Sequence, residues 1–191
     1  MKAIHLRVAF ALTLAVSLHA EDPKPQPTPP KETAVKEIKS EDDWRTLLTD
    51  EQFRVTRQAG TERPDGPEYE KFNKQGDGTY YCVCCAAELF TSSEKFHSGC
   101  GWPSFYDQSK AKNVAERVDN SGGMRRVEVV CTKCDAHLGH VFDGEALSAS
   151  TPTNRRFCIN GVALTFVEKG GKAPLPKGKP AEAAAKPTEK K

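Results

Sequence analysis

Seven cysteines are the residues of this chain with the most chemical potential, and four of them form two Cys-x-x-Cys pairs. The pairs are Cys82/Cys85 and Cys131/Cys134. Four thiolates at this spacing can bind Zn²⁺ tetrahedrally, at about 2.3 Å and with no position left open for a substrate. A long stretch separates the pairs, so the ion would join two distant segments of the chain. The spacing therefore predicts a structural zinc site.

Disulfide bonds are the alternative use of the same pairs. Disulfides persist in oxidising compartments, and cross-pairing between the two motifs is possible in principle. A bond within one Cys-x-x-Cys is typical of redox motifs rather than of structural bridges. We favour zinc. Cys84 offers a third thiol beside the first pair, but the spacing matches Cys82 and Cys85 to Cys131 and Cys134, so we predict that Cys84 is a small buried apolar residue.

Cys158 is a candidate reactive thiol because two arginines, Arg155 and Arg156, precede it. Positive charge lowers the pKa of a thiol and raises the fraction of thiolate. His137 and His140 stand three residues apart and could donate or relay protons near neutral pH. Since Cys134 is close by in sequence, the predicted metal site would fix the positions of both histidines.

Cys100 lies between two glycines, in a segment that also carries Trp102 and Pro103. Flanking glycines favour a mobile or tightly turned backbone, which would let Cys100 approach another thiol. Trp102 could be an anchor of the core, or it could form an apolar wall for a small methyl-bearing group.

The elements that must position these residues are short. Ser40 to Asp43 can cap a first helix, and Thr49 with Gln52 forms a capping-box start for a second. Strand-like runs follow at residues 79–82, 125–130, 140–142, 156–159 and 162–167. Short helices followed by such strands predict a mainly β (α+β) domain that is antiparallel and rich in loops.

The two ends of the chain differ from its middle. Residues 1–20 have the basic start and short apolar run of a signal peptide with cleavage near Ala20, which predicts export to the periplasm or the exterior. The run is too short for a stable membrane anchor. Residues 21–37 are a Pro-rich linker, and residues 169–191 a disordered Lys/Ala/Pro tail. The folded domain is then 38–168.

Charge argues against one class of function. The whole chain carries a net charge of +2, but acidic residues outnumber basic ones within residues 38–168, and the positive excess lies in the tail. An acidic domain is a poor match for a phosphate backbone, so we expect no binding to nucleic acid.

Six motifs, in order, resemble the methionine-R-sulfoxide reductase B family (peptide-methionine (R)-S-oxide reductases). The resemblance covers about residues 41–167, which is nearly the whole predicted domain. The matching stretches are residues 44–63, 81–90, 95–105, 124–131, 137–142 and 156–161.

The resemblance implies two antiparallel sheets with short N-terminal helices and a structural Zn²⁺ on the two cysteine pairs. It implies that Cys158 is the nucleophile and Cys100 the resolving thiol. It further implies that Trp102 packs against the substrate methyl group, while His137, His140 and Asn160 handle the sulfoxide oxygen and ordered water.

The implied reaction repairs oxidised methionine in proteins and peptides under oxidative stress. Cys158 would become a sulfenic acid, and Cys100 would convert it to a Cys100–Cys158 disulfide. A thioredoxin-like dithiol reductant would then regenerate both thiols. The preference for the R-sulfoxide comes from the resemblance alone. We expect a monomer.

Some positions depart from the family pattern. Gly161 stands where serine is frequent, Phe157 replaces the commoner tyrosine, and the segment 145–154 is longer than in many members.

Rival interpretations are a zinc ribbon that binds nucleic acid, an inactive domain held together by disulfides, and a Cys-His-Asn hydrolase using Cys158, His140 and Asn160. On a strand, Asn160 would share a face with Cys158, so it is better placed to touch substrate than to orient a histidine.

Overall fold

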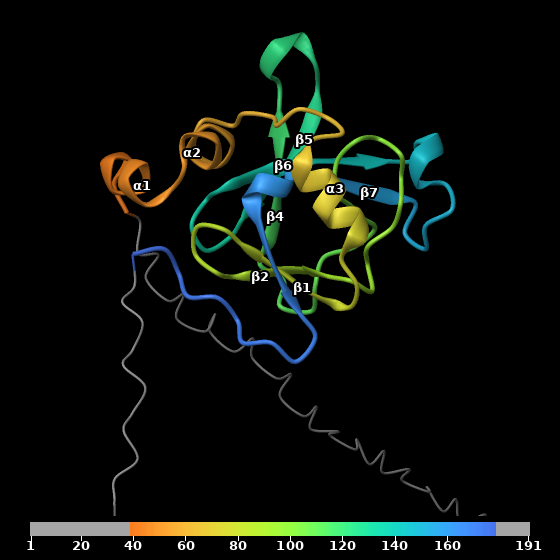
Figure 1. The fold of residues 1–191 in the computed structure, drawn as a ribbon. Helices are drawn as coiled ribbons and strands as arrows, with labels where there is room; N and C mark the ends of the chain where they lie inside the picture. The colour runs from red at the N-terminus through yellow and green to blue at the C-terminus, as the bar shows by residue number, and fades with distance from the viewer. Residues whose placement is uncertain (1–38, 179–191) are drawn as a thin grey trace, which may run out of the picture. The chain divides into compact units, whose positions relative to one another are not determined.

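The computed structural model describes residues 39–178 (Figure 1). The predicted signal peptide, the Pro-rich linker and the end of the predicted tail lie outside the described residues, so these boundaries and the predicted export stay predictions. Within residues 39–178, no helix combines the length and apolar character that crossing a membrane requires.

Two short helices open the domain, and both begin where their caps predict. α1 spans Glu41–Leu47, and the Ser40 side chain accepts from the Asp43 backbone N–H while the Asp43 carboxylate accepts from Ser40. α2 spans Asp50–Arg57 and has the same reciprocal capping box between Thr49 and Gln52. Each box satisfies donors that a helix N-terminus leaves unpaired.

A third helix, α3, spans Pro67–Lys74, a segment for which the sequence predicted neither helix nor strand. Its first residue is a proline, whose fixed φ suits the first helical position. Its inward face carries Tyr69 and Phe72, which are buried. At its other end, the Lys95 ammonium group donates to the carbonyls of Phe72 and Gln75 and so caps the helix.

The strands form two antiparallel sheets, which confirms the predicted fold class. The three-stranded sheet has the order β2-β1-β8, with β1 Gly78–Cys82, β2 Glu88–Thr91 and β8 Leu164–Glu168. The five-stranded sheet has the order β3-β7-β6-β5-β4, with β3 Ser104–Phe105, β4 Val114–Asp119, β5 Arg126–Cys131, β6 His137–Asp143 and β7 Arg155–Ile159. Three short 3₁₀ turns complete the described part, residues 39–178: η1 Ser121–Gly123, η2 Ala146–Ser148 and η3 Gly161–Ala163.

Aromatic side chains fill the core between these elements. Phe105 is fully buried and stacks on Phe90 with ring centroids 4.3 Å apart. The edges of Tyr80 and Phe72 meet the same Phe105 ring at 5.0 and 5.5 Å. Because β1, β2, β3 and α3 all contribute to this one cluster, the core couples both sheets to the third helix.

Residues 169–178 continue along the domain beyond β8. The backbone N–H of Lys177 donates to the carbonyl of Cys84 at 3.0 Å, so this stretch returns to the first cysteine pair. The remaining residues of the predicted tail lie outside the described part of the chain.

Candidate functional site

The structure brings the four paired cysteines into one cluster. Their sulfur atoms all lie within 4.8 Å of one another. Cys82 Sγ is 3.7 Å from Cys134 Sγ, and Cys85 Sγ is 3.6 Å from Cys131 Sγ. A tetrahedral ion with bonds of about 2.3 Å requires sulfur atoms separated by about 3.8 Å. The cluster therefore fits a Zn²⁺-sized ion with four thiolate ligands.

The two cysteine pairs lie on matching turns. In the first, the N–H of Ala86 donates to the Cys82 carbonyl at 2.9 Å; in the second, Asp135 donates to Cys131 at 2.9 Å. Ala86 and Asp135 also share a left-handed backbone, with φ of 58° and 57°. Because one turn joins β1 to β2 and the other joins β5 to β6, a bound ion would connect the two sheets.

Two other residues lie at this cluster. Cys84 is fully buried, and its thiol donates to the Thr56 hydroxyl at 3.5 Å, so it packs in the core as predicted. Arg57, from α2, donates to the carbonyl of Cys134 at 2.8 Å and thereby holds the second turn against the helix.

The remaining two thiols meet at a second place. Cys158, on β7, has its sulfur 3.8 Å from the sulfur of Cys100, which lies in the loop before β3. The Ser98 hydroxyl donates to Cys100 Sγ at 3.1 Å, and Ser104 Oγ lies 3.5 Å from it. All seven cysteines are free thiols in the structure.

Contact between the two thiols governs their protonation. The hydrogen bond with Cys158 lowers the pKa of Cys100 to about 4. The same bond, together with burial, raises the pKa of Cys158, whereas Arg156 lowers it. The two thiols therefore titrate as a coupled pair, and their contact favours one proton shared between the two sulfurs. Arg156 provides one of the two predicted arginine effects on Cys158, while Arg155 forms ion pairs with Glu116 and Asp143.

Strand register places the histidines beside Cys158. His140 is the direct partner of Cys158 across β6 and β7, and Glu128 is the partner of His140 across β5 and β6. Directly paired residues project from the same face of a sheet, so the three side chains form a row. The backbones approach closely here: a Cβ atom added to Gly139 would lie 2.1 Å from the Cys158 carbonyl oxygen.

Each histidine is held by its own carboxylate. His137 Nδ1 donates to Glu128 Oε1 at 2.7 Å, and His140 Nε2 to Asp119 Oδ2 at 2.8 Å. The two rings meet edge to face with centroids 5.5 Å apart. Burial lowers the pKa of His137, and the Glu128 carboxylate opposes this change only in part. Hydrogen bonds from Ser121 and His140 lower the pKa of Asp119.

Asn160 is committed to structural hydrogen bonds. Its Oδ1 accepts from the backbone N–H of Glu62 at 2.9 Å, and its Nδ2 donates to the carbonyl of Leu138 at 3.0 Å. Neither contact orients a histidine, which argues against a Cys-His-Asn hydrolase. The side chain instead ties the segment before α3 to β6.

Glu62 is a buried carboxylate that fixes one wall of the site. It accepts from the N–H groups of Gly161 at 2.6 Å and Val162 at 2.9 Å, while its own carbonyl accepts from the indole N–H of Trp102 at 3.1 Å. Burial raises the pKa of Glu62, and the two N–H donors oppose that change.

A cavity of about 160 Å³ opens beside Cys158 and adjoins these groups. Its lining combines aromatic surface with polar groups and consists of Thr61, Trp102, Arg126, Gly139, His140, Phe142, Cys158 and Asn160. Four of the predicted site residues therefore line one cavity. Cys100 reaches it through its contact with Cys158, and His137 through its contact with His140.

Several site residues were not found by sequence reasoning: Glu62, Asp119, Arg126, Glu128 and Phe142. Asp119 and Glu128 had no distinguishing spacing, because strand pairing brings them to the histidines from 21 and 9 positions away. Glu62 lies within the family-like stretch 44–63, but nothing in its spacing distinguished it as a buried carboxylate.

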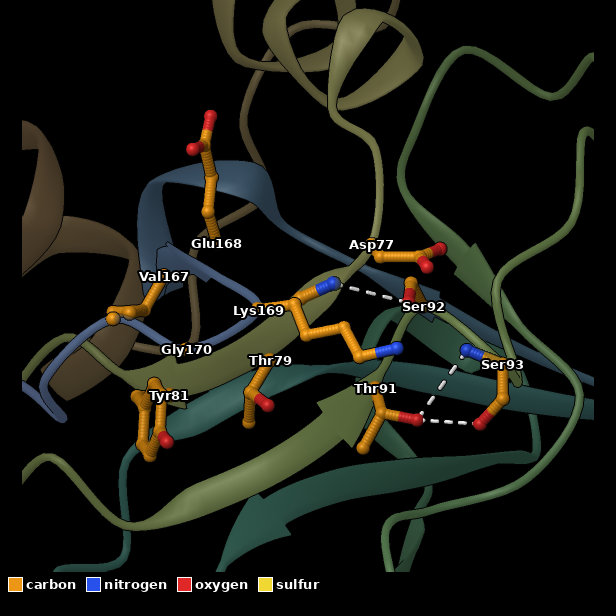
Figure 2. Close-up of a pocket in the computed structure, with 12 residues that line it drawn as sticks. Asp77, Thr79, Tyr81, Thr91, Ser92, Ser93, Val167, Glu168, Lys169 and Gly170 are labelled. Carbon is orange, nitrogen blue, oxygen red and sulfur yellow. Dashed lines mark hydrogen bonds between the residues drawn. The ribbon is translucent and has the colours of Figure 1, made fainter.

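A larger hollow of about 390 Å³ lies elsewhere, along β1, β2 and the end of β8 (Figure 2). Hydroxyl groups dominate its walls, including those of Thr79, Tyr81, Thr91 and Ser93. It includes no cysteine or histidine, so the reactive groups identify the smaller cavity as the candidate site.

Comparisons with known proteins agree on one family. Residues 48–168 match the SelR domain model. The chain is 49% identical over 135 residues to the peptide methionine sulfoxide reductase MsrB of Hahella chejuensis, covering 71% of this chain and 93% of that protein. It is 50% identical over 132 residues to a protein with the same description in Methanosarcina mazei, covering 69% and 89%. A Synechococcus relative is 50% identical over 130 residues, covering 68% and 91%.

Proposed function

Because this chain belongs to the methionine-R-sulfoxide reductase B family, we propose that it reduces methionine-R-sulfoxide in proteins and peptides to methionine. One observation carries the proposal: two thiols 3.8 Å apart lie at a cavity with an aromatic wall and a histidine. The cavity can admit a single side chain, and the thiol pair can supply the two electrons that the sulfoxide requires.

In the first step, the thiolate of Cys158 attacks the sulfoxide sulfur. Transfer of the shared proton to Cys100 leaves the negative charge on Cys158, where the guanidinium of Arg156 stabilises it. A proton from His140 neutralises the oxygen as it moves to Cys158. Methionine is released, and Cys158 is oxidised by two electrons to a sulfenic acid.

In the second step, Cys100 attacks the sulfenic sulfur of Cys158. A disulfide forms and the oxygen leaves as water. The sulfur atoms must approach from 3.8 Å to about 2.05 Å, so one of them has to move. Cys100 is the better candidate to move, because it lies in a loop between two glycines, whereas Cys158 lies within a strand paired on both sides.

Substrate recognition follows from the walls of the cavity. Trp102 and Phe142 offer apolar surface to the methyl group, and His140 offers a donor to the oxygen. The ion pair with Asp119 fixes the direction of the His140 ring. The Glu128–His137 pair packs behind it and restricts its movement.

The four-cysteine cluster lies apart from the cavity and stabilises the fold around it. We propose that Cys82, Cys85, Cys131 and Cys134 hold a structural Zn²⁺. The ion, when bound, supplies a rigid cross-link between the sheets and takes no part in the reaction. The turn at Cys131 and Cys134 leads directly into β6, so it sets where His137 and His140 project.

Three further parts of the proposal rest on sequence and family alone. The electron donor is a thioredoxin-like dithiol protein, the enzyme acts as a monomer, and the signal peptide directs it out of the cytoplasm. The mass of the mature protein tests cleavage near Ala20, and sedimentation tests the monomer.

The decisive experiment is turnover of a peptide that contains methionine-R-sulfoxide, measured for wild type and two variants. Cys158→Ser should release no methionine even in one turnover. Cys100→Ser should release about one methionine per enzyme with thioredoxin as reductant and then stop. Cys84→Ala serves as the control for loss of a thiol and should keep multiple turnovers. Repeated turnover by Cys158→Ser would refute the proposed nucleophile.

A further inference from the structure

The chain contains two methionines, and their positions are informative. Met1 belongs to the predicted signal peptide. Met124 lies in the hairpin tip between β4 and β5, and 54% of its surface is exposed. The tip, residues 120–125, is exposed throughout and projects from the five-stranded sheet (Figure 1). The single methionine of the described residues thus stands on an exposed hairpin tip.

The base of this hairpin forms part of the candidate site. Asp119 and Arg126 are the last paired residues of β4 and β5, and the Asp119 carboxylate binds both Arg126 and His140 at 2.8 Å. Arg126 lines the cavity. Met124 is two residues farther along, which in extended backbone places its side chain on the same face, about 7 Å beyond Arg126.

From this placement we propose that Met124 is itself a substrate: its oxidised form is reduced by the active site of a second copy of this chain. The inference rests on the proposed function. A second copy is favoured over the same copy because the Asp119–Arg126 ion pair fixes the base of the hairpin. The same Asp119 carboxylate holds His140, so bending the hairpin toward its own cavity would disturb the site.

The tip has the properties that a protein substrate needs. The backbone N–H of Met124 bonds only locally, to the Ser121 carbonyl at 3.2 Å, and two glycines precede it. Such a segment can extend into a concave site without unfolding the rest of its domain. The exposed Val118, in contrast, lies in β4, where its backbone is paired with Val127.

The oxidation of Met124 and its reduction are both balanced reactions. Hydrogen peroxide transfers one oxygen to the Met124 thioether, giving the sulfoxide and water. In a second copy, Cys158 removes that oxygen and Cys100 closes the disulfide, giving methionine and one water. Two electrons pass from the thiol pair to the sulfoxide, and a dithiol such as dithiothreitol restores the thiols.

The test uses the full-length mature protein. Cys158→Ser, which cannot reduce itself, is oxidised with hydrogen peroxide, treated with dithiothreitol and freed of oxidant. Mass spectrometry of the peptide around Met124 then measures the added oxygen. A catalytic amount of wild type with dithiothreitol should remove that oxygen from about half of the molecules, because peroxide forms both epimers and this family reduces one.

A matched variant distinguishes the effect of the methionine's place on the hairpin tip from the effect of its solvent exposure alone. In the same Cys158→Ser background, Met124→Leu with Val118→Met moves the methionine to a site that is 60% exposed but lies in a paired strand. It should be oxidised as readily as Met124, yet be reduced at least about tenfold more slowly, because the strand must open first.

The outcomes are distinct. If wild type leaves oxidised Met124 intact but reduces a free methionine-R-sulfoxide peptide in the same tube, the inference is wrong and the proposed function stands. If neither is reduced, the proposed function fails. Equal rates for both methionine positions would show that the tip has no special role as a substrate and would overturn the inference.

Discussion

At the scale of single residues, the site depends on buried ionisable groups that are held by specific partners. Glu62, His137 and Arg156 are each at most 7% exposed. Each has a charged or hydrogen-bonding partner: two backbone N–H groups, the Glu128 carboxylate and the Glu145 carboxylate respectively. Removing one partner therefore leaves a buried polar group unsatisfied, which is the costly kind of change.

His137 should make stability depend on pH. Burial lowers the pKa of His137 in the folded protein, whereas a histidine in the unfolded chain has a pKa of about 6.5. Below that value the unfolded chain binds the extra proton, so stability is full above about pH 6.5 and falls as the pH drops toward the folded pKa. Urea midpoints measured at falling pH should decline more steeply for wild type than for His137→Asn. Parallel pH profiles would contradict this assignment.

Replacing Glu62 should weaken both the fold and the site. The Glu62 carboxylate accepts hydrogen bonds from two backbone N–H groups. In Glu62→Gln, the NH₂ group of the new amide faces one of these donors, so that hydrogen bond is lost. We expect a loss of about 1–3 kcal/mol in the free energy of unfolding. The Glu62 carbonyl also holds Trp102, so kcat/KM should fall as well.

Glu70→Gln is the matched control for Glu62→Gln. Glu70 is an exposed residue of α3 and pairs with the exposed Lys74. Urea unfolding should show little change in this variant. An equal loss of stability in both variants would mean that the two buried N–H contacts of Glu62 are unimportant.

At the scale of elements, the spacing between β6 and β7 controls the geometry of the reaction. Gly139 has no room for a Cβ atom, because one would meet the Cys158 carbonyl at 2.1 Å. Gly139→Ala must push the strands apart, which we expect to cost about 1–3 kcal/mol of stability. It should also separate His140 from Cys158, so kcat should fall by more than the loss of folded protein explains. Urea unfolding and single-turnover rates measure the two effects.

Gly76→Ala is the control for this substitution, because no heavy atom lies within 4 Å of a Cβ placed there. It should leave both quantities nearly unchanged. If Gly139→Ala behaves in the same way, the close approach of β6 and β7 does not position His140.

Local sequence patterns predicted the elements that depend on local interactions. The caps of α1 and α2, the strand at Cys82 and the two cysteine turns all follow from residues within a few positions of one another. α3 was not predicted because it is short and follows turn-rich residues, and its Tyr69 and Phe72 spacing becomes informative only with a core to pack against.

Long-range packing explains what the sequence could not show. Gly161 departs from a frequent serine, and the structure gives the reason: a Cβ atom there would lie 2.6 Å from the Cβ of Glu68 on α3. The short strands β2 and β3 likewise have little pattern of their own. β2 is positioned by pairing with β1, and β3 by pairing with β7. The intrinsic strand propensity of so few residues does not predict such pairing.

At the scale of the whole molecule, the two sheets are joined by the aromatic core and by the cysteine cluster. Metal binding to a preformed set of thiolates contributes to folding free energy. We expect a strong chelator to lower Tm markedly and to reduce activity, and added Zn²⁺ to restore both. Thermal unfolding with quantitation of bound zinc measures the effect.

Cys85→Ser should reproduce the loss of stability without a chelator. Cys84→Ala is the matched comparison, since it removes a thiol from the same turn but leaves all four ligands, and it should still bind one zinc per chain. Retention of the wild-type Tm after complete removal of zinc would contradict a structural role for the ion.

The positions of the two tryptophans give the protein a natural optical signal. Trp44 is buried among the N-terminal helices, whereas Trp102 lies two residues from Cys100 and lines the same cavity as Cys158. A disulfide close to an indole quenches its fluorescence, so emission from Trp102 should change each time the thiol pair is oxidised or reduced. With Trp44 replaced by phenylalanine, the redox state of the working pair could be followed in real time without any added dye.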